Sequence, residues 1–398
     1  MFILSVSENI LSLVCGFGIL QGILLAGLVY FHRKSDKSVN LFLALYIFST
    51  SAIMSLPFIM KIIGWQNSFF LQPLPFLTGP FLYLYLRSFK ETLTWRKVLP
   101  HLIWFVLFFF IAYWNISGLR NKYADAKDLP AEVLNSPRII IVQYVRFGQQ
   151  LLYYFLARKT LLSYQHSIRQ LFSEISRIDL HWTRFLVNGF LILICAFMVI
   201  FPLMRRYPEE FNTLLFLNMA IATPYIYLAV YKGVLQPTIW QVQPGIKKET
   251  VEEKIHEIEE VENTIDQKPK TQKAKLNPEK IKELIGKMEL LMEKEKLFQE
   301  TELTLQQLAL KLNVPTYQVS QALNDGMKKN FYDLVNSYRV EEAKRLLLDP
   351  GNTNYTILSV GFEAGFNSKT TFNTVFKKFT GFTPTEFRDR QRMTTIVE

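Results

Sequence analysis

The chain has 398 residues, enough for more than one domain. Its only cysteines, Cys15 and Cys195, lie inside apolar runs, which excludes a disulfide framework and a CxxC metal site. The formal charge of +11 suggests nucleic acid or a membrane surface as a partner. Residues 1–246 hold 21 basic and 10 acidic residues and so carry this whole excess, whereas residues 276–398 have a net charge of only +1. Net charge therefore cannot be used as evidence for nucleic-acid binding by the C-terminal part.

Long apolar runs fill the N-terminal half of the chain, up to about Lys232. A helix that crosses a bilayer needs about 20 mostly apolar residues. Seven runs approach this requirement: Ile10–Phe31, Val39–Met60, Phe69–Phe89, Val98–Ile116, Ile139–Ala157, Phe185–Phe201 and Phe211–Tyr231. The third is the weakest candidate because three prolines interrupt it. The pattern predicts an all-α fold in which residues 1–235 form a bundle of about seven transmembrane helices.

Basic residues in the loops predict the orientation of these spans. Taken together, the loops after the first, third and fifth spans hold more Lys and Arg than the other loops taken together, including Arg33 and Lys34 after the first span. These loops should face the cytoplasm, which places the N-terminus outside and the C-terminal part in the cytoplasm. The first run is not expected to be a cleaved signal peptide, because it is long and is preceded by Glu8 instead of a basic region. We therefore expect a multi-pass membrane protein.

Arg146 lies near the middle of the fifth expected span, and Gln143 and Gln150 share its helical face. A charge inside a bilayer costs several kcal/mol and usually faces a protein interior or a cavity. One interpretation is a signal site that binds an anionic group. The other is a structural arginine that reaches toward the interface or donates to backbone carbonyls. The sequence does not decide between them.

Two segments after the fifth span also have two interpretations each. Leu161–Leu180 mixes apolar residues with Arg and Ser, which fits an amphipathic helix on the inner membrane surface or a cytoplasmic loop. Residues 236–275 form a Lys- and Glu-rich linker in which successive spacings of 4, 3, 4 and 3 define a seam that a glutamate weakens: Val251, Ile255, Ile258, Glu262 and Ile265. This spacing fits a short coiled coil that pairs two chains, or a solvated tether.

The C-terminal part, residues 276–398, shows clear signals for helix starts and ends. Asn277-Pro278 predicts an N-cap with proline in the first turn, and Thr304 with Gln307 predicts a capping box. The expected helices after these signals are Leu305–Leu312, Thr316–Asn324, Tyr332–Leu348, Ile357–Ala364 and Ser368–Phe379. In the last of these, Phe372, Phe376 and Phe379 should pack inward. Gly365 should end the helix before it, and Thr383-Pro384-Thr385-Glu386 opens a final helix.

Two helix–turn–helix patterns joined by a long helix are thus expected. Their residues resemble the AraC family of transcription regulators over about Leu276–Arg392. The resemblance rests on Asn330-Phe331, Asn336, Tyr338-Arg339, Ala343–Leu347, Ser359–Phe366, Ser368, Phe372, Phe376–Lys378, Gly381, Thr383-Pro384 and Phe387-Arg388. It implies a DNA-binding domain that places two recognition helices in successive major-groove segments. The combination with a multi-span N-terminus is similar to membrane-bound AraC-type regulators of Bacteroidetes-like bacteria.

The resemblance also suggests which side chains contact DNA. The first recognition helix would offer Thr316, Tyr317, Gln318, Ser320 and Gln321. The second would offer Asn367, Ser368, Lys369, Thr370, Asn373 and Thr374. Phosphate contacts are expected from the basic residues Lys328, Lys329, Lys377 and Lys378. The alternative for each group is a solvated polar face.

The leading hypothesis is a membrane-embedded one-component transcription regulator that binds double-stranded DNA in response to an unknown signal ligand. It would act as a homodimer in the lipid bilayer, because dimerisation raises the affinity of a near-neutral domain for DNA. Neither a metal, a cofactor nor enzymatic activity is expected. The alternatives are a membrane transporter or enzyme with a regulatory DNA-binding tail, and a membrane anchor that holds DNA without sensing. The sequence contains no HExxH, Walker or kinase motif that favours an enzyme.

Overall fold

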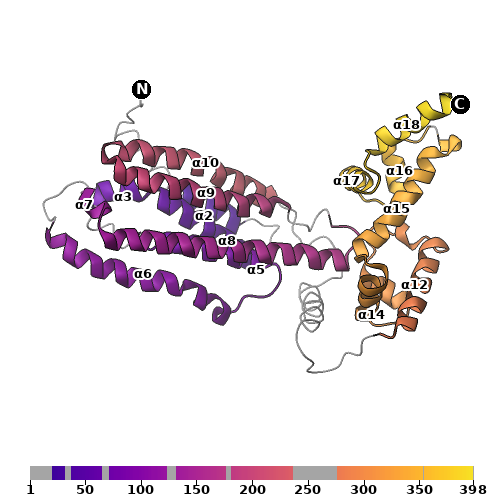
Figure 1. Cartoon of the computed structure of the whole chain (residues 1–398), viewed down its shortest axis with the longest axis horizontal. Helices are drawn as coiled ribbons and strands as arrows, with labels where there is room; N and C mark the ends of the chain where they lie inside the picture. Colours follow the sequence, from indigo (N-terminus) through magenta and orange to yellow (C-terminus); the bar gives the residue numbers. More distant parts are fainter. Residues whose placement is uncertain are drawn as a thin grey trace. The chain divides into compact units, whose positions relative to one another are not determined.

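The computed structural model describes residues 20–31, 37–64, 71–122, 131–175, 181–235, 276–352 and 354–397. Within these ranges the secondary structure is helical, with one isolated β-bridge between Phe172 and Thr304 (Figure 1). The all-α fold class is therefore confirmed. The linker, including the expected coiled-coil positions, lies outside the described residues.

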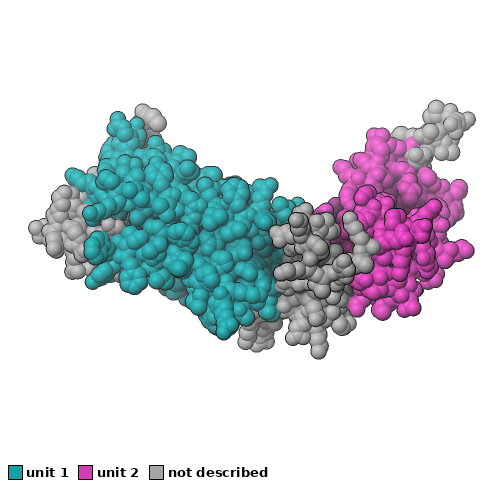
Figure 2. Space-filling model, turned by 60° about the horizontal axis from the view of Figure 1, so that its bottom comes forward, with its two compact units in different colours: residues 1–164, 180–248 teal, residues 165–179, 249–398 magenta. Residues whose placement is uncertain are grey.

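The chain forms two compact units (Figure 2). The first comprises residues 1–164 and 180–248, and the second comprises residues 165–179 and 249–398. The short stretch 165–179 comes from the N-terminal half of the sequence but packs with the C-terminal unit. Neither interpretation of Leu161–Leu180 anticipated this: its helix is the end of a longer one, and the residues that follow contact the C-terminal unit.

The helices of the first unit run along a common direction (Figure 1). They are Leu20–Tyr30, α2 (Lys37–Met54), α3 (Leu56–Ile63), α5 (Pro75–Arg87), α6 (Trp95–Lys122), α7 (Ala131–Leu134), α8 (Pro137–Leu171), α9 (His181–Arg206), η2 (Pro208–Glu210) and α10 (Phe211–Leu235). Helix α2 packs against α5, and α9 packs against α10. Among the buried polar groups, Tyr46 and Tyr225 hydrogen-bond each other through their hydroxyls at 2.6 Å.

Three described helices are long and apolar enough to cross a membrane: Trp95–Trp114, Trp182–Arg206 and Thr213–Gly233. They correspond to the fourth, sixth and seventh expected spans. Leu20–Tyr30 and Val39–Met54 are apolar but shorter. The third expected span contains α5, which has only 13 residues and begins at Pro75. The fifth lies within α8, a 35-residue helix whose Arg, Gln and Tyr side chains lower its apolar character. The count of seven is therefore not confirmed.

The second unit is built around α15 (Phe331–Leu348). The other helices are α12 (Pro278–Glu293), η4 (Leu297–Gln299), α13 (Leu305–Lys311), α14 (Thr316–Gln321), η5 (Ala322–Met327), η6 (Pro350–Asn352), α16 (Ile357–Glu363), α17 (Lys369–Thr380) and α18 (Pro384–Val397). Helix α15 packs against η4 of the first half and against α16, α17 and α18 of the second. Figure 1 shows it running between these two groups of helices.

The helix-start signals read from the sequence are confirmed. The Asn277 side chain accepts from the Glu279 amide at 3.2 Å, and Thr304 and Gln307 form a reciprocal capping box. Thr383 and Glu386 exchange the same two kinds of bond. These contacts depend only on residues three apart or closer, which is why the sequence alone predicts them.

One core expectation was wrong. Phe372 and Phe376 are fully buried, but Phe379 is 38% exposed. Its ring lies 5.3 Å from Nζ of Lys378. Val375 is buried in its place. Phe372, Val375 and Phe376 lie at positions i, i+3 and i+4, which together form one face of α17.

Candidate nucleic-acid interface

Helices α13 and α14 form the first helix–turn–helix unit. Leu305 and Leu308 of α13 pack inward with Val319 of α14, and all three are buried. The turn between the helices places Asn313 at φ +54°, a left-handed conformation that asparagine adopts more readily than most residues. The apolar contacts and this turn fix the angle between α13 and α14.

The first recognition helix is continued by a π-helix, η5, instead of extending as a regular α-helix to Asn324. Gly326 in η5 packs closely on α12: a Cβ atom there would lie 2.5 Å from Cδ1 of Ile285 and 2.7 Å from Cγ2 of Ile281. Lys328 then ends η5 at φ +53°. π-Helical turns are often found at functional sites, and here the turn brings the end of α14 onto α12.

The five predicted residues of α14 are partly buried. Gln318 donates to Oη of Tyr317 at 3.2 Å, and its own side-chain oxygen is buried. Gln321 donates to Asp325 at 3.2 Å and accepts from the Leu276 amide at 3.5 Å. Both glutamines therefore have intramolecular contacts that a bidentate contact with adenine would have to replace. Lys328 and Lys329, which follow η5, are exposed.

Helices α16 and α17 form the second unit. Gly365 has φ +93° and ends α16 as expected, and Phe366 and Phe372 lie in ring contact at 5.0 Å behind the turn. The Ser368 hydroxyl accepts from the Thr371 amide at 3.1 Å, so this predicted contact residue is the N-cap of α17.

The remaining predicted residues of the second unit lie on or just before α17. Five of them are exposed: Lys369, Thr370, Thr374, Lys377 and Lys378. Asn367, Ser368 and Asn373 are half-buried. Lys378 forms an ion pair with Asp333 of α15 at 2.6 Å. The second recognition helix thus offers more exposed polar groups than the first.

Arg339 connects α15 to the loop that precedes α13. Its guanidinium is fully buried and donates to the carbonyls of Phe298 at 2.8 Å, Glu300 at 2.7 Å and Thr301 at 3.3 Å. Burial lowers the pKa of Arg339 to about 10, while the neighbouring Glu174 and Tyr332 act in the opposite direction. The side chain therefore remains charged at neutral pH. Sequence reasoning noticed Arg339 only as part of a motif and gave it no structural role.

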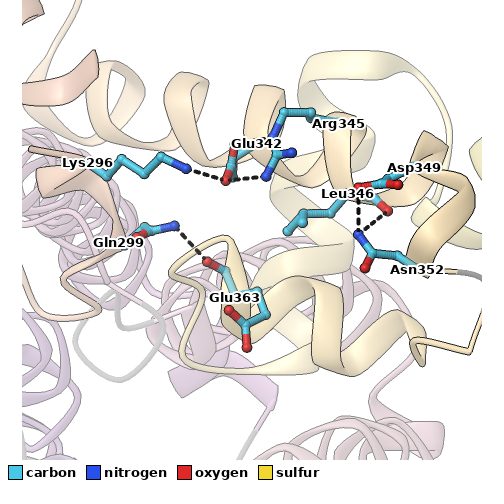
Figure 3. Close-up of polar contacts among 8 residues, drawn as sticks. All are labelled: Lys296, Gln299, Glu342, Arg345, Leu346, Asp349, Asn352 and Glu363. Carbon is cyan, nitrogen blue, oxygen red and sulfur yellow. Dashed lines mark hydrogen bonds and ion pairs between the residues drawn. The ribbon is translucent and has the colours of Figure 1, made fainter. Parts of the chain in front are cut away.

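A second set of polar contacts also joins the loop that precedes α13 to its neighbours (Figure 3). Glu342 accepts from both Nε and Nη2 of Arg345 at 2.9 and 3.0 Å and pairs with Lys296 at 3.0 Å. These bonds, that of Arg345 foremost, lower the pKa of Glu342 to about 2. Gln299 donates to the carbonyl of Glu363 at 3.2 Å and so joins the loop to the end of α16. The loop that precedes α13 is therefore joined to α15 through Arg339 and Lys296, and to the end of α16 through Gln299.

In the first unit, Arg146 of α8 is only 8% exposed. Its guanidinium carbon lies 4.5 Å from the ring of Phe197 and 5.4 Å from that of Phe147. Its Nε has no hydrogen-bond partner among the described residues. Buried arginines normally donate to several acceptors, so the contacts of Arg146 are incomplete.

Two glutamines beside Arg146 have buried side-chain oxygens that also lack hydrogen bonds among the described residues: Gln143 and Gln149. Gln149 uses its amide nitrogen to donate to the carbonyl of Phe76 at 3.0 Å. Gln150, predicted as part of this group, donates to the carbonyl of Pro75 at 3.4 Å. Gln149 was not predicted, although it lies three residues after Arg146. The prediction used only the position four residues after Arg146, which is Gln150.

The part of the chain that the structure describes contains no group of three or more His, Cys, Asp or Glu side chains that could hold a metal ion. Residues 291–390 match the family model of a helix-turn-helix domain, which is of the AraC type. No similar curated protein and no similar solved structure was found. The C-terminal unit therefore carries a helix-turn-helix domain of the kind that binds DNA in transcription regulators.

Proposed function

We propose that the protein is a membrane-embedded, one-component transcription regulator that binds specific sites on double-stranded DNA. The observation that carries this proposal is the pair of helix–turn–helix units on one connecting helix, within the matched residues 291–390. The three long apolar helices support a location in a bilayer. In this proposal the membrane is the bacterial inner membrane, with the N-terminus outside and the DNA-binding unit in the cytoplasm.

Each recognition helix would enter the major groove, with α14 and α17 reading successive segments on one face of the DNA. The first backbone amides of α17, after its N-cap Ser368, would bind a DNA phosphate. The exposed Lys369 and Thr370 lie in the same turn. Two copies of the chain, bound as a homodimer, would occupy adjacent half-sites.

The double substitution Lys369→Ala, Thr370→Ala tests the DNA-binding function. A base contact contributes about 1–3 kcal/mol of discrimination, so we expect binding to weaken at least tenfold. The measurement uses the full chain in nanodiscs and fragments found by genome-wide mapping of the DNA it binds. The matched control is Lys282→Ala, which removes an exposed lysine from α12. Equal affinities of the double variant and the control would contradict the role of α17.

We also propose that Arg146, with Gln143, Gln149 and Gln150, binds the signal ligand. A buried guanidinium with incomplete hydrogen bonding suits an anionic group such as a carboxylate. The two buried amide oxygens would accept from hydroxyl or amine groups on the same ligand. The ligand class is therefore a small anion that also carries hydrogen-bond donors.

Arg146→Gln is expected to abolish the signal-dependent change in target transcription while leaving DNA binding intact, because the substitution removes the positive charge from the site. Reporter transcription with and without candidate nutrients or envelope stress measures this. Arg138→Gln is the control, since Arg138 is an exposed arginine of the same helix. A normal response of Arg146→Gln at normal expression would exclude Arg146 as the signal site.

A further inference from the structure

The end of α8 and the four residues after it pack with the DNA-binding unit. Ser173 is completely buried, and Phe172 and Ile175 on either side of it are also buried. We call residues 165–175 the docking segment. Its contacts, all within the second unit, identify the surface that it occupies.

Ser173 forms hydrogen bonds with three residues of that unit, one in the loop that precedes α13 and two on α15. Its amide and hydroxyl both donate to the carbonyl of Leu303, at 3.2 and 2.7 Å. Its carbonyl accepts from Nδ2 of Asn336 at 3.1 Å, and its hydroxyl accepts from Arg339 at 3.3 Å. Phe172 forms the antiparallel bridge with Thr304, the N-cap of α13. Main-chain pairing of this kind is a common way of binding an extended peptide.

The same segment contacts the surroundings of both recognition helices. Gln170 donates to the side-chain oxygen of Asn324 at 3.3 Å, in the π-helix that directly follows α14. Thr371, in the first turn of α17, lies with its hydroxyl 3.5 Å from a carboxylate oxygen of Glu174. Figure 1 shows α14 and α17 on opposite sides of the end of α8. Five residues of the docking segment thus reach from one helix–turn–helix unit to the other.

The negative charge of Glu174 disfavours a DNA phosphate at the N-terminus of α17. The N-terminus of a recognition helix favours an anion and commonly binds a DNA phosphate. Here the carboxylate lies beside the N-terminal turn of α17 and interacts with the charge of Arg339. A phosphate brought to the same place would be repelled by Glu174 and would overlap the segment between the two units.

We propose that the docking segment and DNA compete for one surface, so that DNA binds only after the segment withdraws. This inference rests on the proposed DNA-binding function and adds an autoinhibitory contact to it. Because the segment includes the end of α8, which also carries Arg146, a ligand that favours one position of α8 would change the docked fraction. The linkage is reciprocal, so DNA binding would also change the affinity for that ligand.

A disulfide that holds the segment in place tests the competition. Phe172 and Thr304 form an antiparallel bridge, and Cα atoms of such pairs lie about 4.5–5.5 Å apart, within disulfide range. The full chain in nanodiscs would carry Phe172→Cys and Thr304→Cys, with Cys15 and Cys195 replaced by serine. Thr304→Cys alone, in the same background, controls for the lost N-cap. Binding to mapped genomic fragments is measured oxidised and after reduction.

We expect the cross-linked protein to bind DNA at least tenfold more weakly than the same protein after reduction, while the single-cysteine control does not change. Equal binding by the cross-linked and reduced forms would overturn the competition but not the DNA-binding function. Failure to cross-link would overturn the docked arrangement. No binding by either form or by the control would overturn the DNA-binding function itself, and the inference with it.

A second comparison needs no cysteine. Glu174→Ala removes the carboxylate beside α17 and is expected to tighten DNA binding several-fold in the absence of signal. Glu289→Ala makes the same change in net charge at an exposed position of α12. Equal tightening by both variants would mean that only the net charge matters and would contradict a specific role of Glu174.

Discussion

Replacing Arg339 by methionine is expected to lower the free energy of unfolding of the C-terminal unit by about 3–5 kcal/mol. The guanidinium is fully buried and donates to the carbonyls of Phe298, Glu300 and Thr301. Methionine fills much of the volume but donates nothing, so these buried acceptors lose their partner. The loop that precedes α13 should then open locally before the rest of the unit.

Hydrogen exchange of the full chain, followed by mass spectrometry of peptides that cover 298–304, measures this opening. Arg345→Met is the control, because Arg345 lies on the same helix with an exposed side chain paired to Glu342. We expect the control to cost about 1 kcal/mol or less. Similar protection in both variants would contradict the structural role given to Arg339.

Replacing Gly365 by alanine is expected to cost the second helix–turn–helix unit about 2–4 kcal/mol. Two effects add. The residue has φ +93°, which L side chains rarely adopt. An added Cβ would also lie 2.7 Å from the carbonyl oxygen of Phe298 and 2.8 Å from Cα of Gln299. Both neighbours are backbone atoms and cannot move aside as a flexible side chain would.

Gly381→Ala separates the two effects. Gly381 has φ +82° but no neighbour within 4 Å of the added Cβ, so only the backbone strain applies. We expect this control to cost about 1 kcal/mol. The rate of exchange in peptides from α16 and α17 of the full chain reports on both variants. If the two substitutions destabilise the unit equally, the close packing at Gly365 has no energetic importance.

The sequence predicted the C-terminal helices well because their boundaries are set by local chemistry. Asn277, Thr304 and Thr383 each cap a helix through residues two or three positions away. The interior was harder to predict. Phe379 has the spacing of a core residue but is exposed, since helical spacing gives the face of a helix and not the point at which its neighbours end.

Long-range contacts explain most of what the sequence did not reveal. Ser173 and Arg339 are separated by 166 residues, and nothing in their local sequence indicates that they meet. The first unit shows a different limit. The run Ile139–Ala157 was predicted as a span, but α8, which contains it, is not among the three described helices that are long and apolar enough to cross a membrane. Arg146 and Gln143 could be proposed as site residues from the sequence because an isolated charge in an apolar run is itself a local signal.

The pairing of lysines in the C-terminal unit bears on how it would search a chromosome. Lys378, Lys311 and Lys344 each contact a carboxylate of the same unit, at 2.6, 3.1 and 2.8 Å. Cations that are already paired within the protein would release few counterions from DNA, so these three lysines would add little to sequence-independent binding. That binding, and its dependence on salt, would come from exposed lysines such as Lys328, Lys369 and Lys377. The residence of the unit at a promoter would further depend on base-edge contacts and on a second copy alongside it.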